Sequence, residues 1–193
     1  MLWNKHHSLI LGKSSQQLGL LRRSCSFSRS LTHRRTLYFK TIIRSQFEHC
    51  STIWRPVTIS QSDKFEALQK RGIKWILKED FALYSDTLYY EKLKSLGILP
   101  IGLKFDYNDL SMFHKIFYNP TAFLDFPQYL SRFDNTDTND LRRHTRSITF
   151  SDNLQITCNV TPRVDAFENT FFYRTHKKWN SLPLKVRECS YWT

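Results

Sequence analysis

Few side chains in this sequence combine the residue types and the spacing that catalysis requires. Two-metal phosphoryl transfer needs carboxylates that converge on the ions, and Asp106 and Asp109 are spaced so that they can share one helix face. A solvated helix start explains the same pair more simply. Glu79-Asp80 is the other close acidic pair in the middle of the chain, and no Gly-x-Ser-x-Gly element marks a nucleophile. The sequence therefore predicts no catalytic residue.

Two short motifs match ligand sites in part. Gly12-Lys13-Ser14 fits the end of a phosphate-binding loop, but such a loop needs an earlier glycine at the position of His7. His6-His7 and His49-Cys50 offer metal ligands, yet no second pair lies at zinc spacing. We therefore expect a basic helix around Lys13, histidines that are structural or face solvent, and neither a metal nor a cofactor.

Positive charge is concentrated at the start of the chain. The formal net charge is +12, from 29 Lys and Arg against 17 Asp and Glu, and residues 1–50 hold nine of the basic residues and one acid, Glu48. A surface of one sign attracts polyanions and releases counterions on contact. Nucleic acid is therefore the leading partner class, and an anionic membrane is the second. A solvated basic face without a specific partner accounts for the same charge.

Basic and aromatic side chains supply the candidate nucleic-acid contacts. The residues expected to bind phosphate are Arg22, Arg23, Arg34, Arg35, Lys40 and Arg44. Most aromatic residues fall on apolar helix faces, which leaves Tyr38, Tyr90 and Tyr173 as candidates for stacking on unpaired bases.

Apolar periodicity predicts a helical first part of the chain. The expected helices run from Trp3 to Arg23, from Thr32 to Pro56, from Ser60 or Ser62 through Ile76, from Leu88 to Leu96, and from Pro100 to Pro120. The second helix is expected to carry Phe39, Ile42, Ile43, Phe47, Cys50 and Trp54 on one stripe, and the last to turn Leu103, Leu110, Phe113 and Phe117 inward. Gly72 leaves room for a neighbouring helix, and Gly97 suits a left-handed helix end.

The pattern changes after residue 118. Residues 119–145 are polar and rich in turn residues, which predicts a loop or linker. Alternation between residues 146 and 160 predicts a small hairpin around Ser151-Asp152-Asn153, and a helix from Val164 to Leu182 is expected to end at Pro183. The predicted fold is mainly α, a bundle of about six helices with one small β-hairpin. Its expected parts are a basic helical domain (1–118), the linker (119–145) and a hairpin with a helix packed on the first part (146–193).

The apolar segments are short. The longest one near the start, Leu9-Ile10-Leu11, is too short for the core of a signal peptide, and no segment approaches the roughly 20 apolar residues of a membrane span. We therefore expect an intracellular protein, in the nucleus or the cytoplasm, that is not secreted and has neither a membrane nor a small-molecule substrate as partner.

Five segments of this sequence, in a fixed order, together carry a resemblance to a known protein family. The first segments are Leu18–Arg23, Ile43–Ser51 with Trp54-Arg55-Pro56, and Glu66–Arg71. The next comprises Leu93–Gly97, Leu99–Ile101, Asp109-Leu110 and Lys115-Ile116. The last comprises Arg174, Trp179-Asn180-Ser181-Leu182-Pro183 and Val186-Arg187. Together these segments resemble the region that follows the palm in reverse transcriptases of Jockey- and CR1-like non-LTR retrotransposons.

This resemblance implies a thumb and a helical extension that bind the RNA of the retrotransposon (element RNA) or a template–primer of DNA and RNA. The parent family is an RNA-directed DNA polymerase, but the Ala-Asp-Asp strand of its palm and its endonuclease motifs have no counterpart here. Where relatives often place adjacent arginines, this chain has Lys104-Phe105-Asp106. We therefore expect a fragment without catalysis that contacts nucleic acid. The alternatives are a protein–protein module whose Trp54 and Trp179 motifs dock on the missing polymerase core, and a truncated remnant of a retroelement without function.

Overall fold

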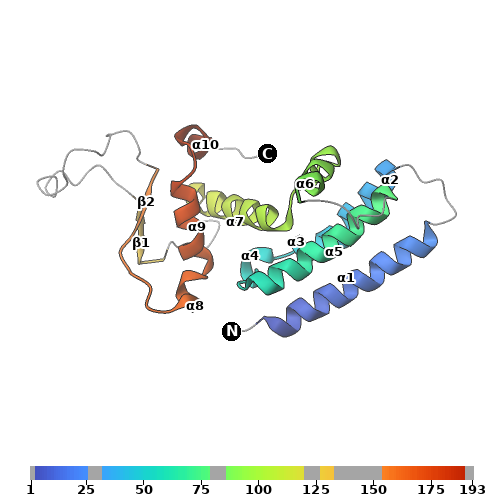
Figure 1. Cartoon of the computed structure of the whole chain (residues 1–193). Coiled ribbons are helices and arrows are strands. Elements are labelled where there is room, and N and C mark those ends of the chain that lie inside the picture. The colour runs from blue at the N-terminus through green and yellow to red at the C-terminus, as the bar shows by residue number, and fades with distance from the viewer. Residues whose placement is uncertain (1–2, 26–31, 79–85, 120–126, 133–153, 190–193) are drawn as a thin grey trace, which may run out of the picture. The chain divides into compact units, whose positions relative to one another are not determined.

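Most of the chain is helical in the structure, a computed structural model, as the sequence predicts (Figure 1). The structure describes residues 3–25, 32–78, 86–119, 127–132 and 154–189. It divides into two compact units, Met1–Asn108 and Asp109–Thr193. The division falls inside the helix that we expected to close a first domain at residue 118, because that helix supplies side chains to the cores of both units.

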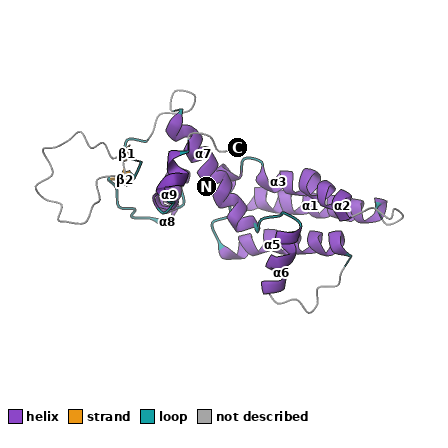
Figure 2. Cartoon of the chain, turned by 90° about the horizontal axis from the view of Figure 1, so that it is seen from above, coloured by secondary structure: helices purple, strands orange, loops and turns teal. Residues whose placement is uncertain are grey.

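Helices build the first unit. Its elements are α1 (Asn4–Ser24), α2 (Thr32–Tyr38), the π-helix η1 (Phe39–Arg44), α3 (Ser45–Glu48), α4 (Ser51–Trp54), α5 (Ile59–Leu77), α6 (Asp86–Ser95) and the start of α7 (Ile101–Tyr118). Both views show α1, α5 and the α2–η1–α3 segment side by side (Figures 1 and 2).

Hydrogen bonds between these helices fix their directions. Gln61 near the start of α5 donates to Asn4 at the start of α1, and Arg22 at the end of α1 donates to the carbonyl of Arg71 late in α5. α1 and α5 are therefore parallel. Arg35 at the start of the α2–η1–α3 segment contacts the end of α5, so this segment runs antiparallel to both. One end of the unit thus gathers the ends of α1 and α5 and the start of α2.

The helix predicted from Thr32 to Pro56 is wrong in two respects. Its middle turns form the π-helix η1, and Phe39, Ile43 and Phe47, at four-residue intervals, lie on one buried face of η1 and α3. The helix then ends at Glu48, because His49 has an extended backbone and Cys50 a left-handed one with φ of 52°. Ile42 and Cys50, which we placed on the apolar stripe, are exposed.

Gly72 allows the close helix contact that the sequence predicts. A Cβ atom at this position would lie 2.1 Å from Cε2 of Phe39, a ring that is completely buried. The π-helix can therefore press Phe39 against the backbone of α5 only where α5 has no side chain. This contact fixes the spacing between the two helices.

The α6–α7 connection also follows the prediction. Gly97 has φ of 59°, and the amide of Ile98 donates to the carbonyl of Leu93 at 2.9 Å, which ends α6 in a left-handed turn. α7 begins directly after Pro100. Leu103, which we expected to face inward, is exposed instead.

The second unit packs a short sheet against a helix. It comprises the rest of α7, the strands β1 (Leu130–Arg132) and β2 (Ile156–Cys158), and the helices α8 (Asp165–Glu168), α9 (Phe171–Asn180) and α10 (Leu184–Glu188). The strands are antiparallel, with Leu130 opposite Cys158. Phe113, Phe117, Leu130, Ile156 and Trp179 form its buried core.

Two predictions for this unit need correction. Ile156–Cys158 is a strand as expected, but its partner is Leu130–Arg132, in the segment that we assigned to a loop. The first strand of the predicted hairpin, together with Ser151-Asp152-Asn153, lies outside the residues that the structure describes. The predicted helix from Val164 to Leu182 is divided, because Thr170 has an extended backbone between α8 and α9.

The contact between Gly72 and Phe39 predicts opposite effects for two glycine-to-alanine substitutions. Gly72→Ala should lower the free energy of unfolding by about 1–3 kcal/mol, because the new methyl group overlaps the Phe39 ring. Gly12→Ala is the control, since a methyl group there would meet no neighbouring side chain within 4 Å and alanine favours the helix by up to about 1 kcal/mol. Chemical denaturation measures both. Equal effects of the two substitutions would contradict the packing described here.

Candidate nucleic-acid interface

Basic side chains from three helices gather at one end of the first unit. We name this surface the basic end, and it consists of Arg22 and Arg23 of α1, Arg34 of α2, and Arg71, Lys74 and Lys78 at the end of α5. Of these residues, only Lys74 is partly buried and the others are exposed. The Arg22 guanidinium donates to the Arg71 carbonyl at 3.2 Å, which holds the ends of α1 and α5 together.

The described helix ends that form this surface contain no acidic residue. Residues 18–25, 32–38 and 70–78 include neither Asp nor Glu, whereas Glu79-Asp80 follows in the sequence and lies outside the described residues. Part of the basic charge compensates the negative ends of the α1 and α5 dipoles, an effect of about 0.3–1 kcal/mol per side chain. This compensation leaves the exposed guanidinium and ammonium groups able to bind phosphate oxygens as well.

Arg35 has a structural role instead of a place in this surface. It is 6% exposed, and its Nη1 donates to the carbonyls of Ile76 at 2.6 Å and Trp75 at 3.1 Å. These carbonyls belong to the last turn of α5, which lacks partners within its own helix. Since the guanidinium already binds the carbonyls at the end of α5, the prediction that Arg35 contacts phosphate is wrong.

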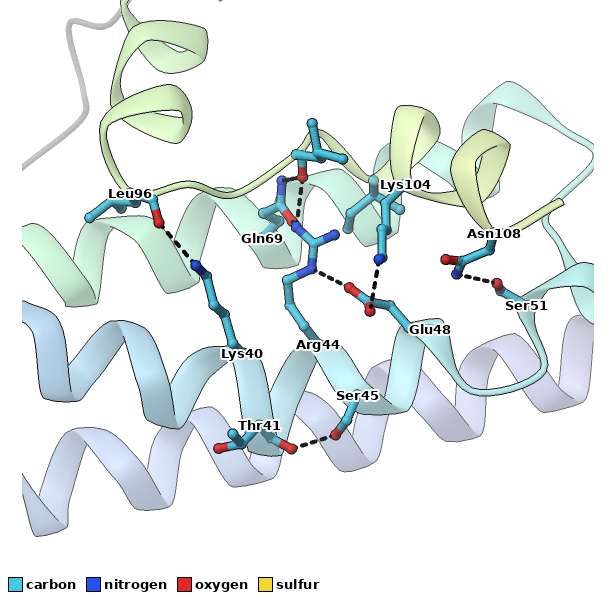
Figure 3. A network of polar contacts seen from close by, with 12 residues as sticks. Lys40, Thr41, Arg44, Ser45, Glu48, Ser51, Gln69, Leu96, Lys104 and Asn108 are labelled. Atoms are coloured by element: carbon cyan, nitrogen blue, oxygen red, sulfur yellow. Dashed lines mark hydrogen bonds and ion pairs between the residues drawn. The ribbon is translucent and has the colours of Figure 1, made fainter. Parts of the chain in front are cut away.

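The prediction that Arg44 contacts phosphate is also wrong, because its guanidinium is used inside the protein. Its side chain is buried and donates from Nε to Glu48 at 2.9 Å and from Nη1 to the side-chain oxygen of Gln69 at 2.8 Å and the carbonyl of Leu99 at 2.6 Å (Figure 3). Lys104 lies 3.6 Å from the same Glu48 carboxylate. Arg44 therefore joins η1 to α5 and to the α6–α7 connection.

Lys40 remains exposed although it also makes an internal contact. Its ammonium group donates to the carbonyl of Leu96 at 3.1 Å, at the end of α6 (Figure 3). An ammonium group has three donors, so this contact orients Lys40 without using all of them.

A second buried group extends the Arg44 contacts. The side-chain amide of Gln69 donates to the Tyr89 hydroxyl at 3.1 Å, and that hydroxyl donates to Glu66. Burial, together with the negative charge of Glu66, raises the pKa of Tyr89 well above its usual range. Tyr89 therefore stays protonated as a donor. The other Glu66 oxygen accepts from the amide of Ile101 at 3.1 Å, where a carboxylate suits the start of α7.

The three candidate stacking residues are placed differently. Tyr38 and Tyr90 are exposed, as expected. Tyr173 is buried, with its ring beside those of Phe167 and His176, so the expectation that it stacks on bases is wrong. Burial lowers the pKa of His176, which favours its neutral form in this cluster.

Asp106 and Asp109, the carboxylates that could share a helix face, are each paired with an arginine, and Glu79-Asp80 lies outside the described residues. Asp106 lies 2.5 Å from Arg55, and Asp109, which is almost completely buried, accepts two hydrogen bonds from Arg174 at 2.9 and 3.0 Å. Among the described residues, no group of three or more His, Cys, Asp or Glu side chains is arranged to hold a metal ion.

The first tryptophan motif of the resemblance is part of the core. Trp54 is buried, its Nε1 donates to the carbonyl of His49 at 2.8 Å, and its own carbonyl lies 2.7 Å from Nε2 of His7. Pro56 is also buried. The motif therefore closes the end of the first unit opposite the basic end.

The second tryptophan motif joins α9 to the sheet. Trp179 is completely buried and donates to the carbonyl of Leu154 at 2.8 Å. The side-chain amide of Asn180 pairs with the backbone of Ile156, accepting from its amide at 3.0 Å and donating to its carbonyl at 2.8 Å. Asn180 thus occupies the hydrogen-bonding edge of β2. Leu182 is half-buried and packs against the core of this unit, and Pro183 is exposed.

Sequence reasoning missed the contribution of α5 to the basic end. Arg71, Lys74 and Lys78 follow one another at three- and four-residue intervals, which is the spacing of one helix face. The charge of residues 51–100 as a whole is nearly balanced, because acids such as Glu79-Asp80, directly after Lys78, offset these basic residues. The helical spacing was the signal that would have found them.

The chain matches no family model, no curated protein and no solved structure in the three comparisons. In the part of the chain that the structure describes, no helix combines the length and the apolar character needed to cross a membrane.

Arginines with different placements predict different effects on stability. Arg44→Met should lower the free energy of unfolding by about 2–4 kcal/mol, because the Gln69 and Leu99 oxygens lose their buried donor. Arg34→Met, the matched exposed control, should change it by less than about 0.5 kcal/mol. Denaturant titration followed by circular dichroism gives both values. If Arg44→Met left the free energy of unfolding unchanged, the buried contacts of Arg44 would not be as described.

Proposed function

We propose that this chain is a non-catalytic module that contacts nucleic acid through the basic end. The bound strand is element RNA or a template–primer, as expected for the thumb and extension of a non-LTR retrotransposon RNA-directed DNA polymerase. The observation that supports this proposal best is the composition of the basic end. Arg22, Arg23 and Arg34 meet the basic residues at the end of α5 there, and the described helix ends that form it contain no acidic residue.

The physical basis is electrostatic. Exposed guanidinium groups bind phosphate oxygens through paired hydrogen bonds and displace condensed counterions, whatever the base sequence. Arg22 and Arg23 come from α1, whereas Arg34 comes from α2, so the surface depends on the packing of the helices and not on one charged segment. A sequence-tolerant contact with the backbone of RNA or of a hybrid follows from this arrangement.

The resemblance supports the same proposal. Arg22 and Arg23 close the Leu18–Arg23 segment, and both belong to the basic end. Other segments of the resemblance supply core contacts: Glu66 accepts from the Ile101 amide, Gln69 donates to Tyr89, and Trp179 donates to the Leu154 carbonyl. In this proposal the core motifs maintain the fold, and the arginines of α1 and α2 perform the binding.

A second candidate function is docking on a polymerase core. At the end opposite the basic end, Ile53, Val57 and Ile59 are 65%, 60% and 81% exposed within one short segment. Apolar side chains exposed together in this way are typical of a protein-binding surface. This function uses a different end of the first unit, so it is compatible with nucleic-acid binding.

Neutralising the arginines of the basic end tests the proposed function. Arg22→Gln, Arg23→Gln and Arg34→Gln, combined, should weaken binding of a short RNA–DNA hybrid at least about tenfold and reduce the slope of log affinity against log salt by up to about 3. Fluorescence anisotropy between about 50 and 200 mM salt measures both quantities.

The matched control removes the same charge from elsewhere in the unit. Lys5, Lys13 and Lys64 are exposed along α1 and at the start of α5, and their combined change to Gln should alter affinity far less. If both triple variants bind equally well, or if affinity is independent of salt, then the basic end is not the binding surface. A functionless remnant would not bind the RNA–DNA hybrid at all.

A further inference from the structure

A pocket lies beside the basic end, between α2 and the end of α6. Its volume is about 330 Å³, and it is lined by Thr32, His33, Thr36, Leu37, Lys40, Ser95 and Leu96. His33, Thr36, Leu37 and Lys40 follow the spacing of one helix face, which turns them together toward Ser95 and Leu96. Arg34 of the basic end is the neighbour of His33 on the same helix.

The walls of this pocket suit a flat group with polar edges. Leu37, which is 51% exposed, and Leu96 provide apolar surface, and His33 adds an imidazole ring. The hydroxyls of Thr36 and Ser95 donate to carbonyls of their own helices, Thr32 at 2.9 Å and Lys92 at 2.8 Å. Since these two hydroxyl protons are already used, Thr36 and Ser95 offer little to replace the hydration of a phosphate.

Lys40, which lines the same pocket, supplies a cation. Its ammonium group is held by the Leu96 carbonyl at 3.1 Å and remains exposed, so its other donors can reach a phosphate outside the pocket. An apolar pocket next to fixed cations is the arrangement that binds single strands, in which bases stack on side chains while the backbone follows positive charge.

We infer that this pocket accepts one unpaired base of the bound strand, with the adjoining phosphate on Lys40 or Arg34. The inference rests on the proposed nucleic-acid binding and adds a preference for unpaired over paired strands, because a paired base cannot enter the pocket. The volume lies at the small end of the range of about 300–1,000 Å³ for small-molecule sites, which suits a single base.

Two oligonucleotides that differ only in their bases test the inference. One is a short single-stranded DNA, and the other is an abasic strand of equal length and charge. The unmodified protein should bind the strand with bases about tenfold more tightly, from one stacked base. His33→Ala combined with Leu37→Ala should bind both strands with equal affinity and keep the salt dependence of binding, because the basic end is unchanged.

A matched pair of exposed residues provides the control. Leu9→Ala combined with His49→Ala removes the same side-chain types from the surface elsewhere in the unit and should keep the tenfold preference. Equal binding of both strands by the unmodified protein overturns the inference, as does a preference that survives in the His33 and Leu37 variant. If neither strand binds at about 50 mM salt, then the proposed function itself fails together with the inference.

Discussion

The buried side-chain amide of Gln69 is the contact on which the first unit depends. It accepts from Arg44 at 2.8 Å and donates to Tyr89 at 3.1 Å and to the carbonyl of Leu99 at 3.3 Å. These contacts join η1, α5, α6 and the segment before α7 at one point without access to water. A buried amide must find partners for both its oxygen and its nitrogen, so these segments can pack in few other ways. Gly72, one turn further along α5, then admits Phe39.

Helix packing in the first unit gives its candidate arginines two different roles. Arg35 and Arg44 point inward and complete carbonyls and side chains of other helices, so their charges stabilise the fold. Arg22, Arg23 and Arg34 remain at the surface, where the ends of three helices meet. The packing of α1, α5 and the α2–η1–α3 segment produces both groups. It buries the inward face of each helix, and it brings the exposed basic side chains at the ends of α1 and α5 and the start of α2 together. A binding surface therefore arises from the packing that holds the unit together.

Local signals in the sequence predicted the features that depend on neighbouring residues. The left-handed turn at Gly97, the start of α7 after Pro100 and the close contact at Gly72 all follow from what one residue type permits. The burial of Arg44 was not predictable, because its partners lie 25 and 55 residues away in the sequence. β1 was missed because a strand of three residues is too short for alternation to show, and its pairing depends on β2 and α9.

The central claim is that nucleic acid contacts the basic end, and backbone amide NMR shifts during titration with a short RNA test it most directly. The account predicts that the largest shift changes fall in residues 18–25, 32–40 and 70–78, with smaller changes in the second unit. Changes concentrated at the starts of α1 and α5, around Ile53, or in β2 and α9 would contradict it.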